Sequence, residues 1–211
     1  GCVGRCAFCD VFARNGRFRV REPEQVVEEV AALLERYAGL RLHFNDSLVN
    51  GSLPVLRRFC ERMVARGLRV PMIGQARARR DMTAEDFALM RQAGFYSVIY
   101  GIETGSEKVR RLMNKTQGAT LDEVATCLAR THDAGLRVGV NLIVGFPGES
   151  RRELEESAEF LIRHRSHIDY IASISCMGIL PQSPVYCHPE RFGVDPETMS
   201  PDHWRTLDGS N

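Results

Sequence analysis

The stretch Arg91-Gln-Ala-Gly94-Phe-Tyr-Ser-Val-Ile-Tyr100 ends an amphipathic helical pattern, turns at a glycine and continues as an apolar, β-branched run. The same order returns at His132-Asp-Ala-Gly135-Leu-Arg-Val-Gly-Val140 and, in shorter form, around Gly39 and Gly67. Glycine suits the position after a helix because it adopts a left-handed backbone at little cost. Helices that alternate with strands in this way predict a parallel sheet joined by right-handed crossovers.

Local signals place the individual elements. Capping-box patterns begin at Thr83, Thr120 and Ser150, and Pro23 suits the first turn of another helix. The predicted helices span residues 23–38, 54–66, 84–93, 107–113, 121–134 and 151–163. The predicted strands span residues 40–44, 68–73, 95–100, 136–144 and 169–175.

These elements predict an α/β protein built as a partial (β/α)6 barrel, about three quarters of a TIM barrel. The five predicted strands correspond to the second to sixth strands of this barrel. We expect the first strand to be missing or truncated at the N-terminus. The chain starts at Gly1 without an initiator methionine, so we expect a piece of a longer polypeptide. Residues 1–190 are predicted to form the barrel, and residues 191–211 to begin a C-terminal extension.

Composition narrows the range of functions. The chain has 211 residues, of which 44% are hydrophobic and 26% charged, as in ordinary globular proteins. Its formal net charge of +1 gives no electrostatic reason to expect a nucleic-acid partner. We find no apolar run long enough to span a membrane. Seven cysteines without a secretory signal predict a reducing compartment, the cytoplasm.

The most informative residues are the three cysteines of the loop Cys2-Val-Gly-Arg-Cys6-Ala-Phe-Cys9. Three thiolates can hold three irons of a cubane cluster and leave the fourth iron open to a small molecule. Gly4 allows tight bending, and Phe8 provides an apolar cover near the sulfurs. Zinc or inert thiols are the alternatives, although no second C-x-x-C and no H-x-x-x-H follows.

Two further motifs lie at predicted strand ends. They are Gly101-Ile-Glu103-Thr-Gly105-Ser106 and Asn141-Leu-Ile-Val-Gly145-Phe-Pro-Gly148-Glu149. Together with the cysteine loop, in this order and context, they resemble the radical S-adenosylmethionine (SAM) superfamily over about residues 1–190.

The resemblance implies a specific chemistry. In that family the three cysteines, here Cys2, Cys6 and Cys9, hold a 4Fe–4S cluster whose open iron is chelated by the amino and carboxylate groups of SAM. Reduction cleaves SAM to methionine and a 5′-deoxyadenosyl radical, which takes a hydrogen atom from the substrate. The expected partners are a small-molecule substrate and an external electron donor such as flavodoxin or ferredoxin.

The resemblance also implies cofactor-binding residues. Glu103 is expected to accept hydrogen bonds from the SAM amino group or ribose, and Gly101 and Gly105 to let the backbone approach a ligand. Arg77 is either a partner of the SAM carboxylate or a solvated side chain. The other expected cofactor-binding residues are Phe8, Ser106, Asn141, Ile143 and Gly145, whereas Glu149 is expected to order its turn. The catalytic residues are left open.

The remaining polar and thiol groups have weaker signals. Cys60 and Cys127 fall within predicted helices and are expected to be buried. His43 is expected to pack rather than to take part in chemistry. Asn45 and Asp46 either line the pocket or form an Asx turn.

One branch of the family is favoured. The segments Phe44-Asn-Asp-Ser-Leu-Val-Asn-Gly51 and Leu180-Pro-Gln-Ser-Pro-Val-Tyr186 resemble members that follow a cobalamin-binding domain. That resemblance implies cobalamin bound upstream of this chain and a C-methylation or ring modification. In the second of these segments the family often has Pro-Gly-Thr-Pro-Leu-Tyr, whereas this chain has Pro-Gln-Ser-Pro-Val-Tyr. The identity of the substrate is therefore left open. The alternatives are a methylthiotransferase acting on tRNA and a non-catalytic zinc-binding module.

Overall fold

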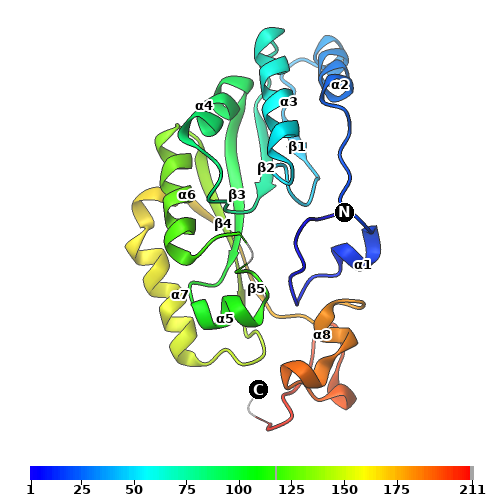
Figure 1. The fold of residues 1–211 in the computed structure, drawn as a ribbon, viewed down its shortest axis with the longest axis vertical. Helices are drawn as coiled ribbons and strands as arrows, with labels where there is room; N and C mark the ends of the chain where they lie inside the picture. The colour runs from blue at the N-terminus through cyan, green and yellow to red at the C-terminus, as the bar shows by residue number, and fades with distance from the viewer. Residues whose placement is uncertain (117, 210–211) are drawn as a thin grey trace.

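A computed structural model describes residues 1–116 and 118–209 of the chain. Its centre is a parallel sheet whose spatial order is the sequence order, β1-β2-β3-β4-β5. The strands are β1 (Leu42–Phe44), β2 (Met72–Ala76), β3 (Phe95–Glu103), β4 (Arg137–Val144) and β5 (Tyr170–Cys176). In Figure 1 helices α4, α6 and α7 lie along one side of the curled sheet, and the segments that carry α1 and α8 lie on the other. The arrangement is the expected partial barrel.

Six helices begin at, or within one residue of, their predicted starts, whereas the short helices α1 and α8 were not predicted. The helices are α1 (Val11–Asn15), α2 (Pro23–Arg36), α3 (Leu53–Ala65), α4 (Ala84–Ala93), α5 (Glu107–Leu112), α6 (Leu121–Asp133), α7 (Arg151–Arg163) and α8 (Pro184–Cys187), with 3-10 turns at Arg165–His167, Pro189–Phe192 and Pro196–Thr198. Capping boxes start α4, α6 and α7, as predicted. These boxes satisfy backbone donors that a helix start otherwise leaves exposed.

Two strand predictions need correction. The strand expected at residues 68–73 is β2, which begins only at Met72. Leu68 still donates its backbone N–H to Met63 at the end of α3, and Pro71 has no N–H to donate to a ladder. The strand expected to end at Tyr100 continues to Glu103, with a register shift between Gly101 and Glu103.

A second apolar cluster anchors the cysteine loop. It joins Ala7 to Val109 of α5, to Met113 just after that helix, and to Val194 and Trp204 near the C-terminus. The Ala7 backbone bonds to Met113 on one side (2.9 Å), and its carbonyl accepts from Val185 of α8 on the other (3.0 Å). The loop is therefore fixed by two parts of the chain that each lie more than a hundred residues further along the sequence. The division into residues 1–190 and 191–211 stays a prediction.

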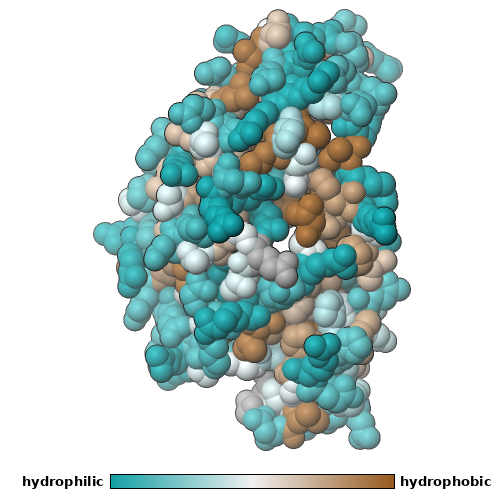
Figure 2. All heavy atoms as spheres, in the orientation of Figure 1, coloured by the Kyte–Doolittle hydropathy of each residue, from teal (hydrophilic) through white to brown (hydrophobic). Residues whose placement is uncertain are grey.

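Within residues 1–116 and 118–209, β1 and β5 each pair with one neighbour only. An apolar groove of about 340 Å³ runs beside β1 and is lined by Phe18, Val26, Phe44 and other side chains. Figure 2 shows apolar surface gathered beside α3 in this region. On β5 the side chain of Ile174 is 61% exposed. In the described part of the chain, no helix is both long and apolar enough to cross a membrane.

Candidate cofactor site at the strand ends

The three cysteines lie on one short loop at the start of the chain. Cys2, Cys6 and Cys9 are half-buried free thiols. The Gly4 backbone N–H donates to Cys2 Sγ at 3.3 Å, and a Cβ built on Gly4 would lie 3.5 Å from that sulfur and 3.7 Å from Cys6 Sγ. The backbone at position 4 therefore lies against two of the sulfurs.

The donor set of three cysteine thiols on one loop fits a cubane cluster. In residues 1–116 and 118–209, no three His, Cys, Asp or Glu side chains are grouped closely enough to hold one metal ion. A cubane does not require such convergence, because each thiolate binds a different iron. Burial raises the pKa of the Cys6 thiol, while the nearby Lys115 ammonium opposes that rise, and burial also raises the pKa of Cys9. Iron must displace these protons when it binds.

The three cysteines share one cavity of about 510 Å³ with residues from the C-terminal ends of β1, β2 and β3 and from β4. Ligands of parallel α/β sheets bind at the C-terminal ends of the strands. Five of the predicted cofactor-binding residues line the cavity: Phe8, Arg77, Gly101, Glu103 and Asn141. His43, Asn45 and Asp46 line it as well, and His43 is exposed rather than packed, contrary to expectation, because β1 is an edge strand.

Glu103 has an unusual backbone. Its φ of 64° is in the left-handed region, which costs a residue with a Cβ about 1–3 kcal/mol and is most often retained at functional sites. Its carboxylate is mostly buried and accepts from Lys115 Nζ at 3.0 Å. A Cβ on Gly101 would overlap Glu103 Oε1, so glycine at that position leaves room for the carboxylate.

Lys115 is a site residue that the sequence did not reveal. Its ammonium also donates to the Gly101 carbonyl at 2.5 Å and lies 5.9 Å from the centre of the Phe8 ring. The chain reaches this point because Asn114 takes a positive φ after α5 and its side chain donates to the Arg5 carbonyl. An asparagine just past a predicted helix end is a turn signal, but it does not show where the next side chain points.

Arg77 is held by a second residue missed from the sequence, Asn50. The buried Asn50 amide accepts from Arg77 N at 3.1 Å and donates to the Arg77 carbonyl at 2.8 Å. A Cβ on Gly118 would overlap the Arg77 guanidinium. Within the described ranges no carboxylate forms an ion pair with Arg77.

Four predicted cofactor-binding residues lie outside this cavity: Gly105, Ser106, Ile143 and Gly145. Gly105 N donates to Ser157 Oγ of α7, and Gly145 N donates to Glu149 Oε2 at 2.6 Å. The latter bond agrees with the turn-ordering role expected for Glu149. The cofactor roles of the four residues stay predictions.

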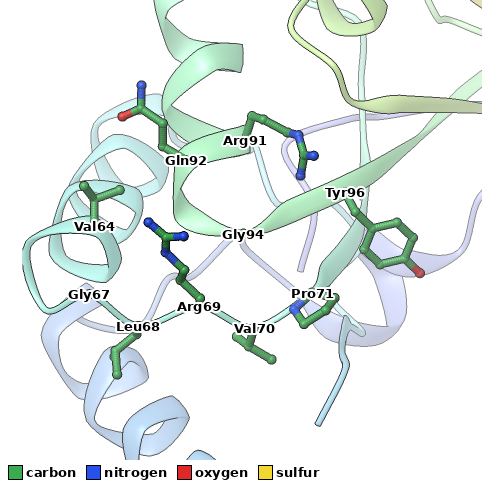
Figure 3. A pocket seen from close by; sticks show the side chains of 10 residues that line it. All are labelled: Val64, Gly67, Leu68, Arg69, Val70, Pro71, Arg91, Gln92, Gly94 and Tyr96. Carbon is green, nitrogen blue, oxygen red and sulfur yellow. The ribbon is translucent and has the colours of Figure 1, made fainter. Parts of the chain in front are cut away.

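A larger hollow, of about 680 Å³, lies at the other end of the sheet, beside the N-terminal ends of β2 and β3. Figure 3 shows it between the α3–β2 and α4–β3 connections, with Arg69 and Arg91 beside it and Tyr96 across from them. Its lining contains no Cys, His, Asp or Glu. It therefore offers neither a metal ligand nor a general base, and size alone does not make it the active site.

The chain has relatives of known sequence. It is 26% identical over 202 residues to the "Hopanoid C-2 methylase" of Rhodopseudomonas palustris (strain TIE-1), covering 92% of this chain and 37% of that protein. It is 31% identical over 177 residues to "Ribosomal protein uS12 methylthiotransferase RimO" of Saccharopolyspora erythraea (strain ATCC 11635 / DSM 40517 / JCM 4748 / NBRC 13426 / NCIMB 8594 / NRRL 2338). That alignment covers 78% of this chain and 36% of the RimO protein. The chain thus spans little more than a third of these relatives.

A solved structure has the same fold. The radical S-adenosylmethionine methyltransferase TsrM from Kitasatospora setae, with cobalamin and a [4Fe-4S] cluster bound, superposes with a TM-score of 0.77 at 19% identity. The superposition covers 95% of this chain and 39% of that one. The family model described as "Radical SAM superfamily" matches residues 1–161, which include the cysteine loop, Glu103 and Gly145. The chain therefore belongs to the radical SAM superfamily.

Proposed function

We propose that this chain is the core of a cobalamin-associated radical SAM enzyme that methylates, or otherwise modifies, a small molecule. The observation that carries the proposal is that three free cysteines line one cavity with the Glu103–Lys115 ion pair. In the proposed site the cysteine thiolates hold a 4Fe–4S cluster. When bound, that cluster supplies the electron that cleaves SAM reductively.

The Glu103–Lys115 pair suits the amino acid end of SAM. That end carries an ammonium and a carboxylate on one carbon, and the pair offers an acceptor and a donor 3.0 Å apart. In the proposed site Glu103 accepts from the ammonium and Lys115 donates to the carboxylate. Arg77, which lines the same cavity, remains the alternative partner of the carboxylate.

The branch of the family rests on the relatives and neighbours. The TsrM structure holds cobalamin as well as the cluster, and the hopanoid relative is named as a methylase. By analogy, cobalamin is bound by a part of the protein outside this chain, and flavodoxin or ferredoxin supplies the electron. All seven cysteines are free thiols, as suits a reducing, cytoplasmic setting. The small net charge gives no support to a nucleic-acid substrate.

A methylthiotransferase is the second candidate, because the RimO relative has the higher identity, 31%. The two functions differ in their metal content. A methylthiotransferase of this type needs a second iron–sulfur cluster, whereas the proposed enzyme needs cobalamin.

The proposal is tested by iron loading. Anaerobic reconstitution of the protein should give about four irons and four sulfides per chain. Cys6→Ala should lose the cluster, whereas Cys187→Ala, an exposed thiol outside the cavity, should load normally. Equal loading of the two variants would contradict the assignment of the cysteine loop, and stoichiometric zinc would favour the non-catalytic alternative.

A further inference from the structure

Arg110 of α5 is a buried charge on the wall of the cavity. Its side chain is 3% exposed, and it lines the cavity together with the cysteines. One guanidinium nitrogen donates to the Ala119 carbonyl at 2.6 Å, and Nε has no hydrogen-bond partner among the described residues. A buried guanidinium with an unused donor is costly unless something else satisfies it.

Arg77 brings a second guanidinium to the same place. Its side chain packs against Gly118, next to the Ala119 carbonyl that Arg110 contacts. Burial lowers the pKa of Arg110, Glu107 opposes this, and the Arg77 charge lowers it further. Two cations held this close repel each other, so their juxtaposition favours an anion between or beside them.

The carboxylates of Glu107 and Glu103 are already engaged. Glu107 reaches Arg110 Nε only at 3.8 Å, and its other oxygen accepts from Leu121 N at 2.7 Å. Glu103 is paired with Lys115 at 3.0 Å. Within residues 1–116 and 118–209, Arg77 therefore has no acidic partner and Arg110 has a distant one.

We propose that Arg77 and Arg110 form an oxyanion subsite that holds a phosphate, phosphonate or carboxylate group of the substrate. This inference rests on the proposed function, because it assigns the substrate class of that same cavity. SAM is accommodated without the two arginines, since Glu103 and Lys115 already match its amino and carboxylate groups. Guanidinium groups suit the role because their planar donors bind oxyanions in a bidentate manner.

Binding of simple anions to the reconstituted protein tests the proposal. Inorganic phosphate, methylphosphonate and acetate are titrated by calorimetry at constant ionic strength. At least one of the three anions should bind saturably. Arg77→Met and Arg110→Met should each lower the affinity for that anion about tenfold or more. Arg80→Met, an exposed arginine outside the cavity, should bind as the unaltered protein does. The anion bound most tightly identifies the kind of oxyanion.

Two results would overturn the subsite. One is the absence of saturable binding of any of the three anions, and the other is unchanged binding in Arg77→Met, which keeps the test valid if Arg110→Met does not fold. The spectrum of the reduced cluster with and without SAM separates this inference from the proposed function. Loss of the SAM response in Arg77→Met would assign Arg77 to the cofactor instead. Failure of the unaltered protein to bind a cluster would contradict the proposed function, whether or not the anions bind.

Discussion

Glu103 and Lys115 are the residues on which the proposed cofactor geometry depends most. Glu103 keeps a left-handed backbone at the end of β3, and Lys115 reaches it from the turn after α5. Both side chains are mostly buried, at 11% and 15% exposure, so their attraction is weakly screened by solvent. Such a pair has a use in addition to stability, because a zwitterionic ligand can insert between its charges.

Lys115→Met should weaken SAM binding about tenfold or more, because a charge-assisted hydrogen bond contributes about 1.5–3 kcal/mol. Equilibrium dialysis of the reconstituted protein with labelled SAM measures the effect. Lys115→Arg keeps the charge and should restore most of the affinity. Unchanged affinity in Lys115→Met would remove Lys115 from the cofactor site.

At the scale of elements, α7 is locked onto the loop that carries Glu103. Ser157 Oγ accepts from the Gly105 backbone at 2.9 Å and makes a second hydrogen bond with Thr104. A Cβ on Gly105 would lie 2.6 Å from Phe160 Cβ and 2.8 Å from Ser157 Cα. The glycine therefore allows a close approach of helix to loop.

Gly105→Ala should lower the free energy of unfolding by about 1–3 kcal/mol, the usual cost of overpacking. Urea unfolding of the metal-free protein measures it. Gly4→Ala is the matched control, because its Cβ would have only ordinary contacts, the nearest at 3.5 Å. Equal stability of the two variants would show that α7 can move away from the loop freely.

The start of α7 should respond to acid. Glu153 accepts from Ser150 and Lys108, and these hydrogen bonds lower its pKa from 4.5 to about 2. Its contribution to stability is therefore complete above pH 4.5 and is lost as the pH falls toward 2. Thermal unfolding at pH 7 and pH 3 should show a smaller acid loss in Glu153→Gln than in the unaltered protein. Glu159→Gln, an exposed change on the same helix, should behave like the unaltered protein, and an identical acid loss in Glu153→Gln would contradict the assignment.

The sequence predicted the helices better than the strand ends. Capping boxes such as Thr120 with Glu123 are local, so their signals survive without tertiary context. The bounds of a strand depend on pairing with the neighbouring strands, which a local sequence pattern does not reveal. For this reason the observed start of β2, after Pro71, and the observed end of β3, at Glu103, differ from the predicted ones. The cysteine loop and Glu103 were recognisable from their motifs. Lys115, Asn50 and Arg110 were not, because only folding brings them to the cavity.

At the scale of the whole molecule, the sheet has two open edges within the described residues, at β1 and β5. Unpaired strand edges can join a second chain. On β5, Ile171 and Ile174 are exposed by 48% and 61%, so this edge presents apolar side chains as well as free backbone groups. The chain also spans little more than a third of its relatives.

Residues 1–211 alone should therefore self-associate, as light scattering after size-exclusion chromatography can measure. Ile174→Lys should reduce the association without loss of stability, because the side chain is already exposed. Ile162→Lys, equally exposed but on α7, should leave it unchanged. A chain that is monomeric at high concentration would contradict the prediction.

The most direct test of the central claim is the anaerobic EPR spectrum of the iron-reconstituted, reduced protein with and without SAM. A 4Fe–4S signal that shifts when SAM is added is the predicted result, because a cluster held by three cysteines would leave one iron open to the cofactor. A cluster signal indifferent to SAM, or a well-folded protein that binds no cluster, would contradict the claim.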